Sequence, residues 1–135
     1  MADIKIFNPD GLFKPASPYR QVAYAETQGL VFIAGQTPID ASGSTVGAND
    51  FEAQCAQVFA NIHTCLRAVN ADWKNVVQFT SYLTRPQDAA AFRAYRARGF
   101  PKFFADEAYP PNTLLIINRL ADESYWLEVQ TIAAL

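Results

Sequence analysis

The chain has 135 residues, of which 50% are hydrophobic and 13% aromatic, so a single domain over residues 1–135 is expected and a disordered chain is excluded. Its formal net charge of -2 provides no excess of positive charge to bind a phosphate backbone, which argues against nucleic acid as a partner. The N-terminus MADIKIFNPDG lacks a secretory signal, and no apolar run approaches the ~20 residues of a membrane span. We therefore expect a cytoplasmic protein that does not bind membranes.

The first half of the chain predicts a strand at residues 4–7 and a hairpin between residues 21–27 and the apolar run LVFIAG. Residues 50–69 predict an amphipathic helix, because apolar side chains recur at steps of three and four. Asn49 or Asp50 is expected to cap its start, and Asn70 to end it. The apolar stripe of this helix consists of Phe51, Cys55, Val58, Ile62, Cys65 and Val69, widened by Phe59 and Leu66.

The second half begins with a strand predicted over residues 76–84 from its β-branched and aromatic content. A second helix is expected to start at Pro86 and to end at Gly99. The following segment FPKFFADEAYPPN is expected to be irregular, because Tyr-Pro-Pro disfavours helix. Two further strands are predicted over residues 113–120 and 125–134.

This order of elements predicts an α/β (α+β) domain with a six-stranded sheet and two helices on one face. The run LLII at residues 114–117 is apolar on both sides of its strand, because successive side chains point to opposite faces. A sheet with one uncovered face would then expose more apolar surface than soluble monomers usually tolerate. We therefore expect copies of the chain to associate through this face.

Cys55 and Cys65 lie ten residues apart in one predicted helix. That spacing separates them by ~15 Å, which is too far for a disulfide, so both are expected to be buried thiols. The chain has one histidine, so a Cys/His metal cluster is not available and no metal site is expected.

Glu128 is the candidate general acid/base, because it stands in the apolar last strand. A buried carboxylate must be paired, hydrogen-bonded or protonated, and such groups perform proton transfer. Two other interpretations remain open: a glutamate that faces solvent at a sheet edge, and one that pairs with Arg119 across the hairpin.

Other polar residues carry weaker signals. The chain has no GxSxG, GxGxxG or Walker motif. Arg93, Arg96 and Arg98 predict a solvated basic face on the second helix, with anion binding as the alternative. Tyr19 follows Pro18 in a loop, where it either packs half-buried or projects into a cleft.

Six segments occur in the order and spacing of a known family: SPYRQV, GLVFIAGQTPID, ANIHTCLRAV, VVQFTSYLT, YPPNTLLIINRL and LEVQTIA. Over residues 7–134 the chain resembles the Rid family of reactive-intermediate deaminases, also called the YjgF family, for which endoribonuclease L-PSP is an older label. The block GLVFIAGQTPID and the C-terminal pair of strands are the most specific parts of this resemblance.

The resemblance implies a chorismate-mutase-like fold, with a mixed sheet and two helices on one face, and a homotrimer whose sheets pack into a central barrel. It also implies small-molecule sites in the clefts between subunits. Deaminating members hydrolyse enamine and imine intermediates, such as 2-aminoacrylate, to a 2-keto acid and ammonia. No metal or organic cofactor is implied.

Four residues match the family's site residues. Tyr19 matches a tyrosine in the cleft, and Gly35 matches a glycine whose backbone amide faces the substrate. Glu128 matches the glutamate that orients the attacking water. Leu114 matches a residue whose backbone lines the site, although its side chain departs from the cysteine common in the family.

The chain departs from the family at Asn112. Deaminating members have Pro-Ala-Arg-Ser where this chain has Pro-Pro-Asn-Thr, so the arginine that binds the substrate carboxylate is missing. Asparagine is neutral and cannot form the charged bidentate fork of a guanidinium. Arg20 is the nearest alternative cation in the sequence.

Three hypotheses follow. The first is a cofactor-independent hydrolase that acts on another imine or enamine through Glu128, with weak or absent 2-aminoacrylate deaminase activity. The second is a trimer that binds a small metabolite without turnover. The third, a ribonuclease, is disfavoured by the acidic composition and by the single histidine.

Overall fold

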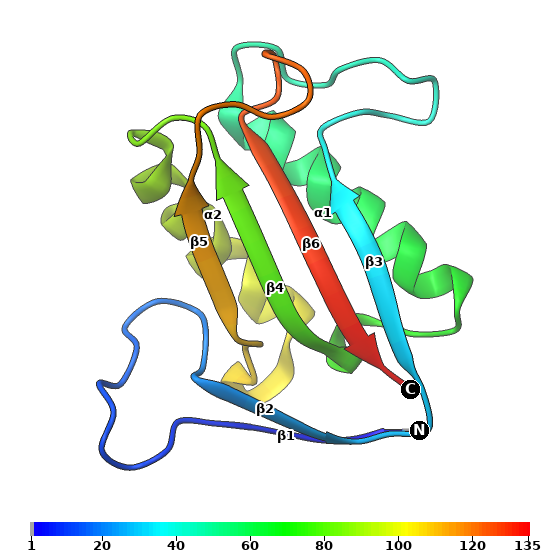
Figure 1. Cartoon of the computed structure of the whole chain (residues 1–135), viewed down its shortest axis with the longest axis vertical. Helices are drawn as coiled ribbons and strands as arrows, with labels where there is room; N and C mark the ends of the chain where they lie inside the picture. The colour runs from blue at the N-terminus through cyan, green and yellow to red at the C-terminus, as the bar shows by residue number, and fades with distance from the viewer. Residues whose placement is uncertain (1) are drawn as a thin grey trace.

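A computed structural model describes residues 2–135 (Figure 1). Three strands precede the first helix, one strand separates the two helices, and two strands follow the second helix. In chain order they are β1 (Asp3–Phe7), β2 (Val22–Glu26), β3 (Leu30–Gln36), α1 (Phe51–Ala68), β4 (Val76–Leu83), α2 (Asp88–Phe103), β5 (Asn112–Ile116) and β6 (Leu127–Ala134). Two short 3-10 turns, η1 (Trp73–Asn75) and η2 (Ala105–Glu107), follow α1 and α2.

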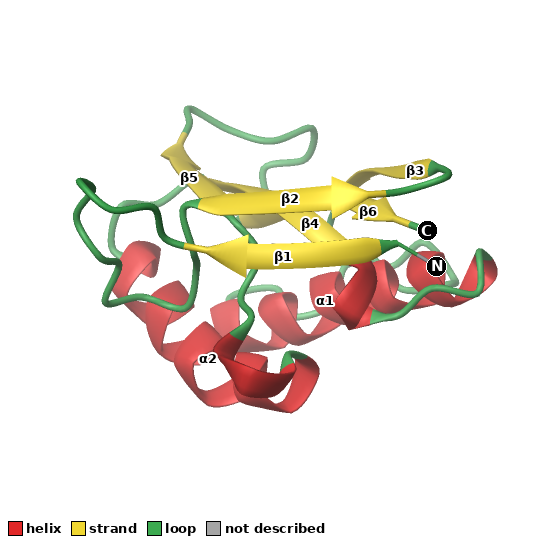
Figure 2. Cartoon of the chain, turned by 90° about the horizontal axis from the view of Figure 1, so that it is seen from below, coloured by secondary structure: helices red, strands yellow, loops and turns green. Residues whose placement is uncertain are grey.

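The strands form two sheets. The main sheet has four strands in the order β3-β6-β4-β5, in which β4 and β5 are parallel and the other neighbours are antiparallel. The expectation of a mixed sheet is therefore confirmed. Strands β1 and β2 form a separate antiparallel pair that crosses one end of the main sheet (Figures 1 and 2).

The expectation of a single six-stranded sheet is wrong for this chain, and so is the expected hairpin between β2 and β3. The turn between β2 and β3 forms its backbone hydrogen bonds with Leu135 at the C-terminus. The N–H of Gln28 donates to the carbonyl of Leu135 at 3.2 Å, and the N–H of Leu135 donates to the carbonyl of Gly29 at 2.9 Å. Strand β3 accordingly pairs with β6, and β2 pairs with β1. Alternation of apolar side chains identifies a strand but does not identify its partner.

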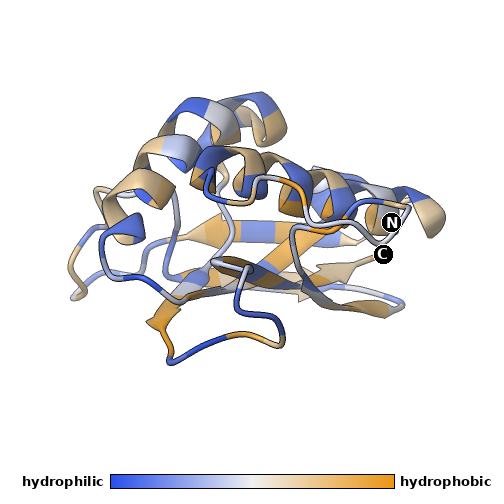
Figure 3. Ribbon diagram, turned by 90° about the horizontal axis from the view of Figure 1, so that it is seen from above, coloured by the Kyte–Doolittle hydropathy of each residue, from blue (hydrophilic) through white to orange (hydrophobic). Residues whose placement is uncertain are grey.

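Both helices cover the same face of the main sheet, as expected (Figure 3). The core between the two layers is rich in aromatic rings that gather around Phe59 of α1. This ring lies 6.0 Å from Phe79 of β4 and 5.5 Å from Phe100 of α2, both in edge-to-face geometry. Such contacts contribute beyond simple apolar burial, so they fix the two helices against the sheet.

The ends of α1 agree with the sequence. Asp50 caps its start by accepting from Ala53 N–H at 3.1 Å, and Asn70 lies just after the helix at a φ of 59°. The buried stripe is rotated from the expected one: Cys55 is buried, Cys65 is half-buried and Val69 is exposed. Both cysteines are free.

Helix α2 is longer than expected, because it continues past Gly99 to Phe103. A glycine inside a helix costs about 1 kcal/mol, whereas full burial of a phenylalanine contributes about 1.5–3 kcal/mol. Phe100 is fully buried, so its packing outweighs the weak helix propensity of Gly99. The last two strands are shorter than expected and begin at Asn112 and Leu127.

The face of the main sheet without helices is mixed in character rather than uniformly apolar. Polar residues of β4 and β6, namely Gln78, Thr80 and Gln130, lie on this face between two apolar edges. On the β3 edge Phe32 is 70% exposed, and the edge strand β5 exposes Leu114, Leu115 and Ile116. Within residues 2–135 no helix combines the length and the apolar character that a bilayer crossing requires.

Candidate functional site

Glu128 lies on the open face of the main sheet, where its side chain packs directly over Gly35 of the neighbouring strand. Gly35 falls at an irregularity in the register between β3 and β6, between Ile33 and Gln36. A Cβ placed on Gly35 would lie 2.8 Å from Cδ and 2.9 Å from Cγ of Glu128. Real Cβ atoms do not approach so closely, so any side chain at this position would force the side chain of Glu128 to move.

A cavity of about 330 Å³ opens beside Glu128. Tyr82 stands opposite Glu128 in the register of β4 and β6, which brings their side chains together on one face. Ile117 and the buried Leu120 give the cavity an apolar wall. The residues that line it are Gly35, Tyr82, Ile117, Leu120, Glu128 and Gln130.

Burial raises the pKa of Glu128 above its ordinary value of 4.5. No lysine or arginine lines this cavity, so no cation there offsets the loss of solvation. The expected alternative of an ion pair with Arg119 is wrong, because Arg119 pairs with Glu123 at 3.1 Å. A half-buried carboxyl group with a raised pKa is suited to accepting a proton from water and returning it.

Tyr19 does not line the Glu128 cavity. It is half-buried in the loop between β1 and β2, where its N–H donates to Ser17 at 2.7 Å. Arg20 follows it and does not line that cavity either: its guanidinium lies 5.2 Å from the ring centre of Tyr109 and donates to the carbonyl of Tyr19. Within one chain, Tyr19 therefore lies apart from the cavity that Gly35 and Glu128 line, although the three residues were expected to share one site.

Asn112 and Leu114 occupy strand β5, away from the lining of the Glu128 cavity. The Oδ1 atom of Asn112 accepts from Ser81 Oγ at 2.7 Å, so its amide oxygen is engaged within the chain. Leu114 stands beside Ser81 in the parallel register and is 37% exposed at the sheet edge. Of the five predicted site residues, the structure brings together Gly35 and Glu128.

Sequence reasoning missed Tyr82 and Gln130 as cavity residues. Alternation in the strand at residues 76–84 places Tyr82 on the face opposite Phe79 and Leu83, and the sequence alone shows this. The sequence does not show that Tyr82 pairs with Glu128, because these two residues are 46 positions apart and their pairing depends on the register of β4 and β6.

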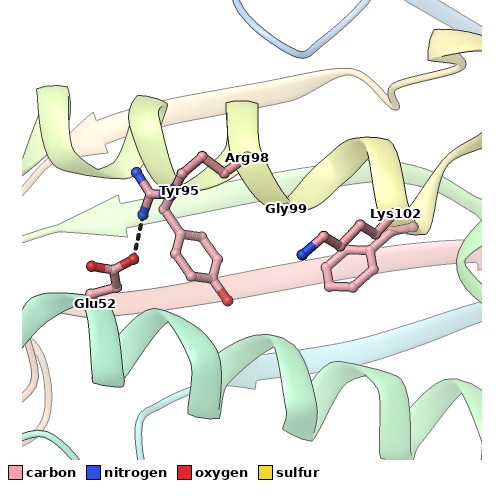
Figure 4. Close-up of a pocket in the computed structure, with 6 residues that line it drawn as sticks. Glu52, Tyr95, Arg98, Gly99 and Lys102 are labelled. Carbon is pink, nitrogen blue, oxygen red and sulfur yellow. Dashed lines mark hydrogen bonds and ion pairs between the residues drawn. The ribbon is translucent and has the colours of Figure 1, made fainter.

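A second cavity, of about 370 Å³, lies between α1 and α2 (Figure 4). Arg98 donates to Glu52 at one end of it, and the ring of Tyr95 stacks on Phe59 at 5.9 Å. Because the guanidinium of Arg98 already pairs with the carboxylate of Glu52, it is less available to bind an anionic ligand in this cavity. Within residues 2–135, no cluster of three or more His, Cys, Asp or Glu side chains could hold a metal ion.

Comparisons with known proteins agree with this architecture. The family model described as endoribonuclease L-PSP matches residues 11–135. A RutC family protein of Pyrococcus horikoshii is 31% identical over 120 residues, which cover 89% of each protein.

Solved structures are similar over most of the chain. The YyfB protein of Yersinia pestis, described as a conserved Rid family protein of unknown function, has a TM-score of 0.85, 26% identity and 98% coverage of both chains. Yeast Mmf1 has a TM-score of 0.68 at 21% identity, also with 98% coverage of both, which shows a shared fold. The chain therefore belongs to the endoribonuclease L-PSP family, which is the Rid (YjgF) family.

Proposed function

We propose that this protein is a divergent Rid-family hydrolase that needs no cofactor and acts on a small imine or enamine without a carboxylate. The observation that carries the proposal is the carboxyl group of Glu128, held against Gly35 in a cavity without cations. A carboxylate substrate would repel ionised Glu128 and would find no guanidinium there to bind it.

The chemistry requires one base and one water. Glu128 accepts a proton from water as the oxygen attacks the imine carbon, which forms a carbon–oxygen bond and moves the C=N electron pair to nitrogen. The proton passes from Glu128 to that nitrogen and gives a carbinolamine. Glu128 then takes the hydroxyl proton of the carbinolamine and passes it to the nitrogen, so that the C–N bond breaks, ammonia leaves and the carbonyl forms. The net reaction converts an imine and one water into a carbonyl compound and ammonia. Tyr82, opposite Glu128, is placed to hold the substrate nitrogen or the water.

We further propose that the active form is a homotrimer and that the cleft between subunits completes the site. Two features support this. Phe32 and Leu115 are exposed on the helix-free face, and the main sheet ends in two edge strands, β3 and β5, that retain unpaired backbone groups. A second subunit on this face would also deepen the cavity beside Glu128 and exclude water from it.

The second candidate is a trimer that binds a small metabolite without turnover. The hydrogen bond between Asn112 and Ser81 favours it. Asn112 stands where the family has the arginine that binds the substrate carboxylate, and its side-chain oxygen already accepts a hydrogen bond from Ser81. This candidate predicts stabilisation by a ligand against heat with no product.

Two assays separate these functions. In a coupled serine-dehydratase assay the wild-type chain is expected to show little or no 2-aminoacrylate hydrolysis. With neutral imines generated by an amine oxidase, it is expected to speed ammonia release. Glu128→Gln should reduce that release by about 10²-fold or more, because general base catalysis is worth about 10²–10⁴-fold.

The matched control is Glu123→Gln, since Glu123 is exposed and pairs only with Arg119 on the surface. Its turnover should equal that of the wild type. Unchanged turnover in Glu128→Gln would refute the hydrolase. If a restored guanidinium is sufficient, Asn112→Arg should raise 2-aminoacrylate hydrolysis, whereas rates typical of a deaminase in the wild type would contradict the assignment of a substrate without a carboxylate.

A further inference from the structure

Arg96 of α2 is buried without a partner. It is 4% exposed, and its Nε and Nη1 atoms are buried with no hydrogen-bond acceptor among residues 2–135. Its guanidinium lies 4.5 Å from the ring centre of Phe92. Arginine is rarely fully buried unless it is paired, because a buried donor without an acceptor loses its hydrogen bonds to water and gains none in return. The expectation of a solvated face at this position is therefore wrong.

The surroundings of Arg96 supply no negative charge to compensate it. Burial and the positive charge of Arg93, one turn earlier, lower the pKa of Arg96 to about 10, so it remains a cation at neutral pH. Cys55 lies nearby, but burial raises the pKa of its thiol, which stays neutral. The positive charges of Arg93 and Arg96 thus act on each other, and neither residue has a carboxylate partner among residues 2–135.

A cavity of about 390 Å³ opens at the same part of α2, between the helix and the loop that joins β1 to β2. Arg93 and Ala97, which flank Arg96 in the helix, line one side of it. Lys14 and Arg20 line the loop side, and Glu107 is the one carboxylate among the lining residues. Three cations therefore face this cavity in a chain whose net charge is negative.

The pairing of the other arginines shows how unusual this place is. Arg67, Arg85, Arg98 and Arg119 each have a carboxylate partner. Arg20, Arg93 and Arg96 have none among residues 2–135, and neither does Lys14. Arg20 and Arg93 therefore line the cavity without a carboxylate partner, and the buried Arg96, which does not line it, lies between the lining residues Arg93 and Ala97 in the helix.

We propose that Lys14, Arg20 and Arg93 form a binding site for a small anion that carries a carboxylate or a phosphate group, next to the buried positive charge of Arg96. The planar guanidinium fork matches both groups, since each presents two oxygen atoms in one plane. Tyr109, under Arg20, and the buried Pro15 and Pro18 hold the loop side of the site in place. The site shares no lining residue with the Glu128 cavity, so it goes beyond the proposed function.

The test follows the side-chain Nε–H resonances of Arg20 and Arg93 by NMR. Potassium phosphate and sodium propionate are titrated separately at constant ionic strength, with chloride as the replacement ion. At least one anion should shift both resonances and reach saturation. Saturation by phosphate alone assigns a phosphoryl ligand, saturation by propionate alone assigns a carboxylate ligand, and saturation by both assigns a general anion site.

Arg93→Gln should weaken this binding by about 10-fold or more, because a charge-assisted hydrogen bond is worth about that factor. Arg98→Gln is the matched control on the same helix, because Arg98 already pairs with Glu52, and its affinity should stay within about 2-fold of the wild type. Because Arg93 is exposed, its replacement should not prevent folding, so Arg93→Gln is informative even if replacement of the buried Arg96 prevents folding.

Three results would overturn the proposal. The first is the absence of a saturable shift with either anion. The second is an affinity that Arg93→Gln leaves unchanged. The third is a shift of the Arg20 and Arg93 resonances with protein concentration and not with anion, which would identify a carboxylate of a second copy as the acceptor. None of these outcomes bears on Glu128, so the two proposals fail separately.

Discussion

The side chain of Glu128 occupies the space in which a side chain on Gly35 would have to lie. The constraint is set by contact between two strands: Cδ and Cγ of Glu128 would be 2.8 and 2.9 Å from a Cβ on Gly35. Glycine at this position therefore permits a carboxyl group to lie flat against the sheet, partly out of water. Burial of the carboxyl group also raises the pKa of Glu128.

Gly35→Ala should displace Glu128. We expect a loss of less than about 1 kcal/mol in the free energy of unfolding, because the displaced atoms belong to a flexible side chain beside a cavity, together with a loss of imine hydrolysis. Urea denaturation and the ammonia-release assay measure the two effects. Gly29→Ala is the control, because a Cβ there meets nothing within 4 Å. Equal stability and turnover in the two variants would refute the proposed contact.

The stability of the protein should depend on ionisation of Glu128. Because its pKa is raised above 4.5, the folded state binds this proton more tightly than the unfolded chain does. Its contribution to stability is full below pH 4.5 and is lost as the pH rises through the raised pKa. Glu128→Gln should therefore be as stable as the wild type at low pH and more stable at neutral pH.

Chemical denaturation of both proteins across pH 4–8 measures this difference, with Glu123→Gln as the exposed control. A difference between wild type and Glu128→Gln that stays constant with pH would show that Glu128 titrates normally. Catalysis should show the opposite trend, since only the ionised base accepts a proton, so turnover should rise with pH through the same pKa.

Arg85 should contribute more to stability than the exposed arginines. It donates two hydrogen bonds to the buried Asp88, at 2.8 and 2.7 Å, and stacks 3.6 Å from the ring centre of Trp126. Arg85→Gln leaves the Asp88 carboxylate buried without its partner, which costs about 3–5 kcal/mol. Arg98→Gln, which removes an exposed pair with Glu52, should cost less than about 1 kcal/mol in the same urea titration. Similar losses would refute this ranking.

Gln54 joins three segments of the chain. Its amide nitrogen donates to the carbonyls of Gly47 and Ser124, and its oxygen accepts from Trp126 N–H at 2.8 Å. Gln54→Leu leaves these groups unsatisfied beside a fully buried side chain, so we expect a loss of about 3 kcal/mol. Thermal unfolding checks it.

The control for this variant is Gln57→Leu, which removes a single side-chain bond to Asn61. Its loss should be about 1 kcal/mol. If both variants unfold at the same temperature, Gln54 does not hold the loop before α1 against the start of β6.

The sequence by itself determined the elements, because their patterns are local. The step of three and four in residues 51–66 gives α1 its buried side, and the side chain of Asp50 caps its start within the same turn. The match of six ordered segments likewise predicted the family, and the two helices on one face followed from counting elements against one sheet.

Only the tertiary structure decided which residues meet. Strand partners depend on contacts between distant positions, so the sequence could not show that β3 pairs with β6 or that Tyr82 stands opposite Glu128. The sequence also could not show that Arg98 forms an ion pair with Glu52, whereas Arg96 is buried with two nitrogen atoms that have no hydrogen-bond acceptor among residues 2–135. These two arginines are the same residue type two positions apart. Their charges behave differently because burial and partners are properties of the packed chain.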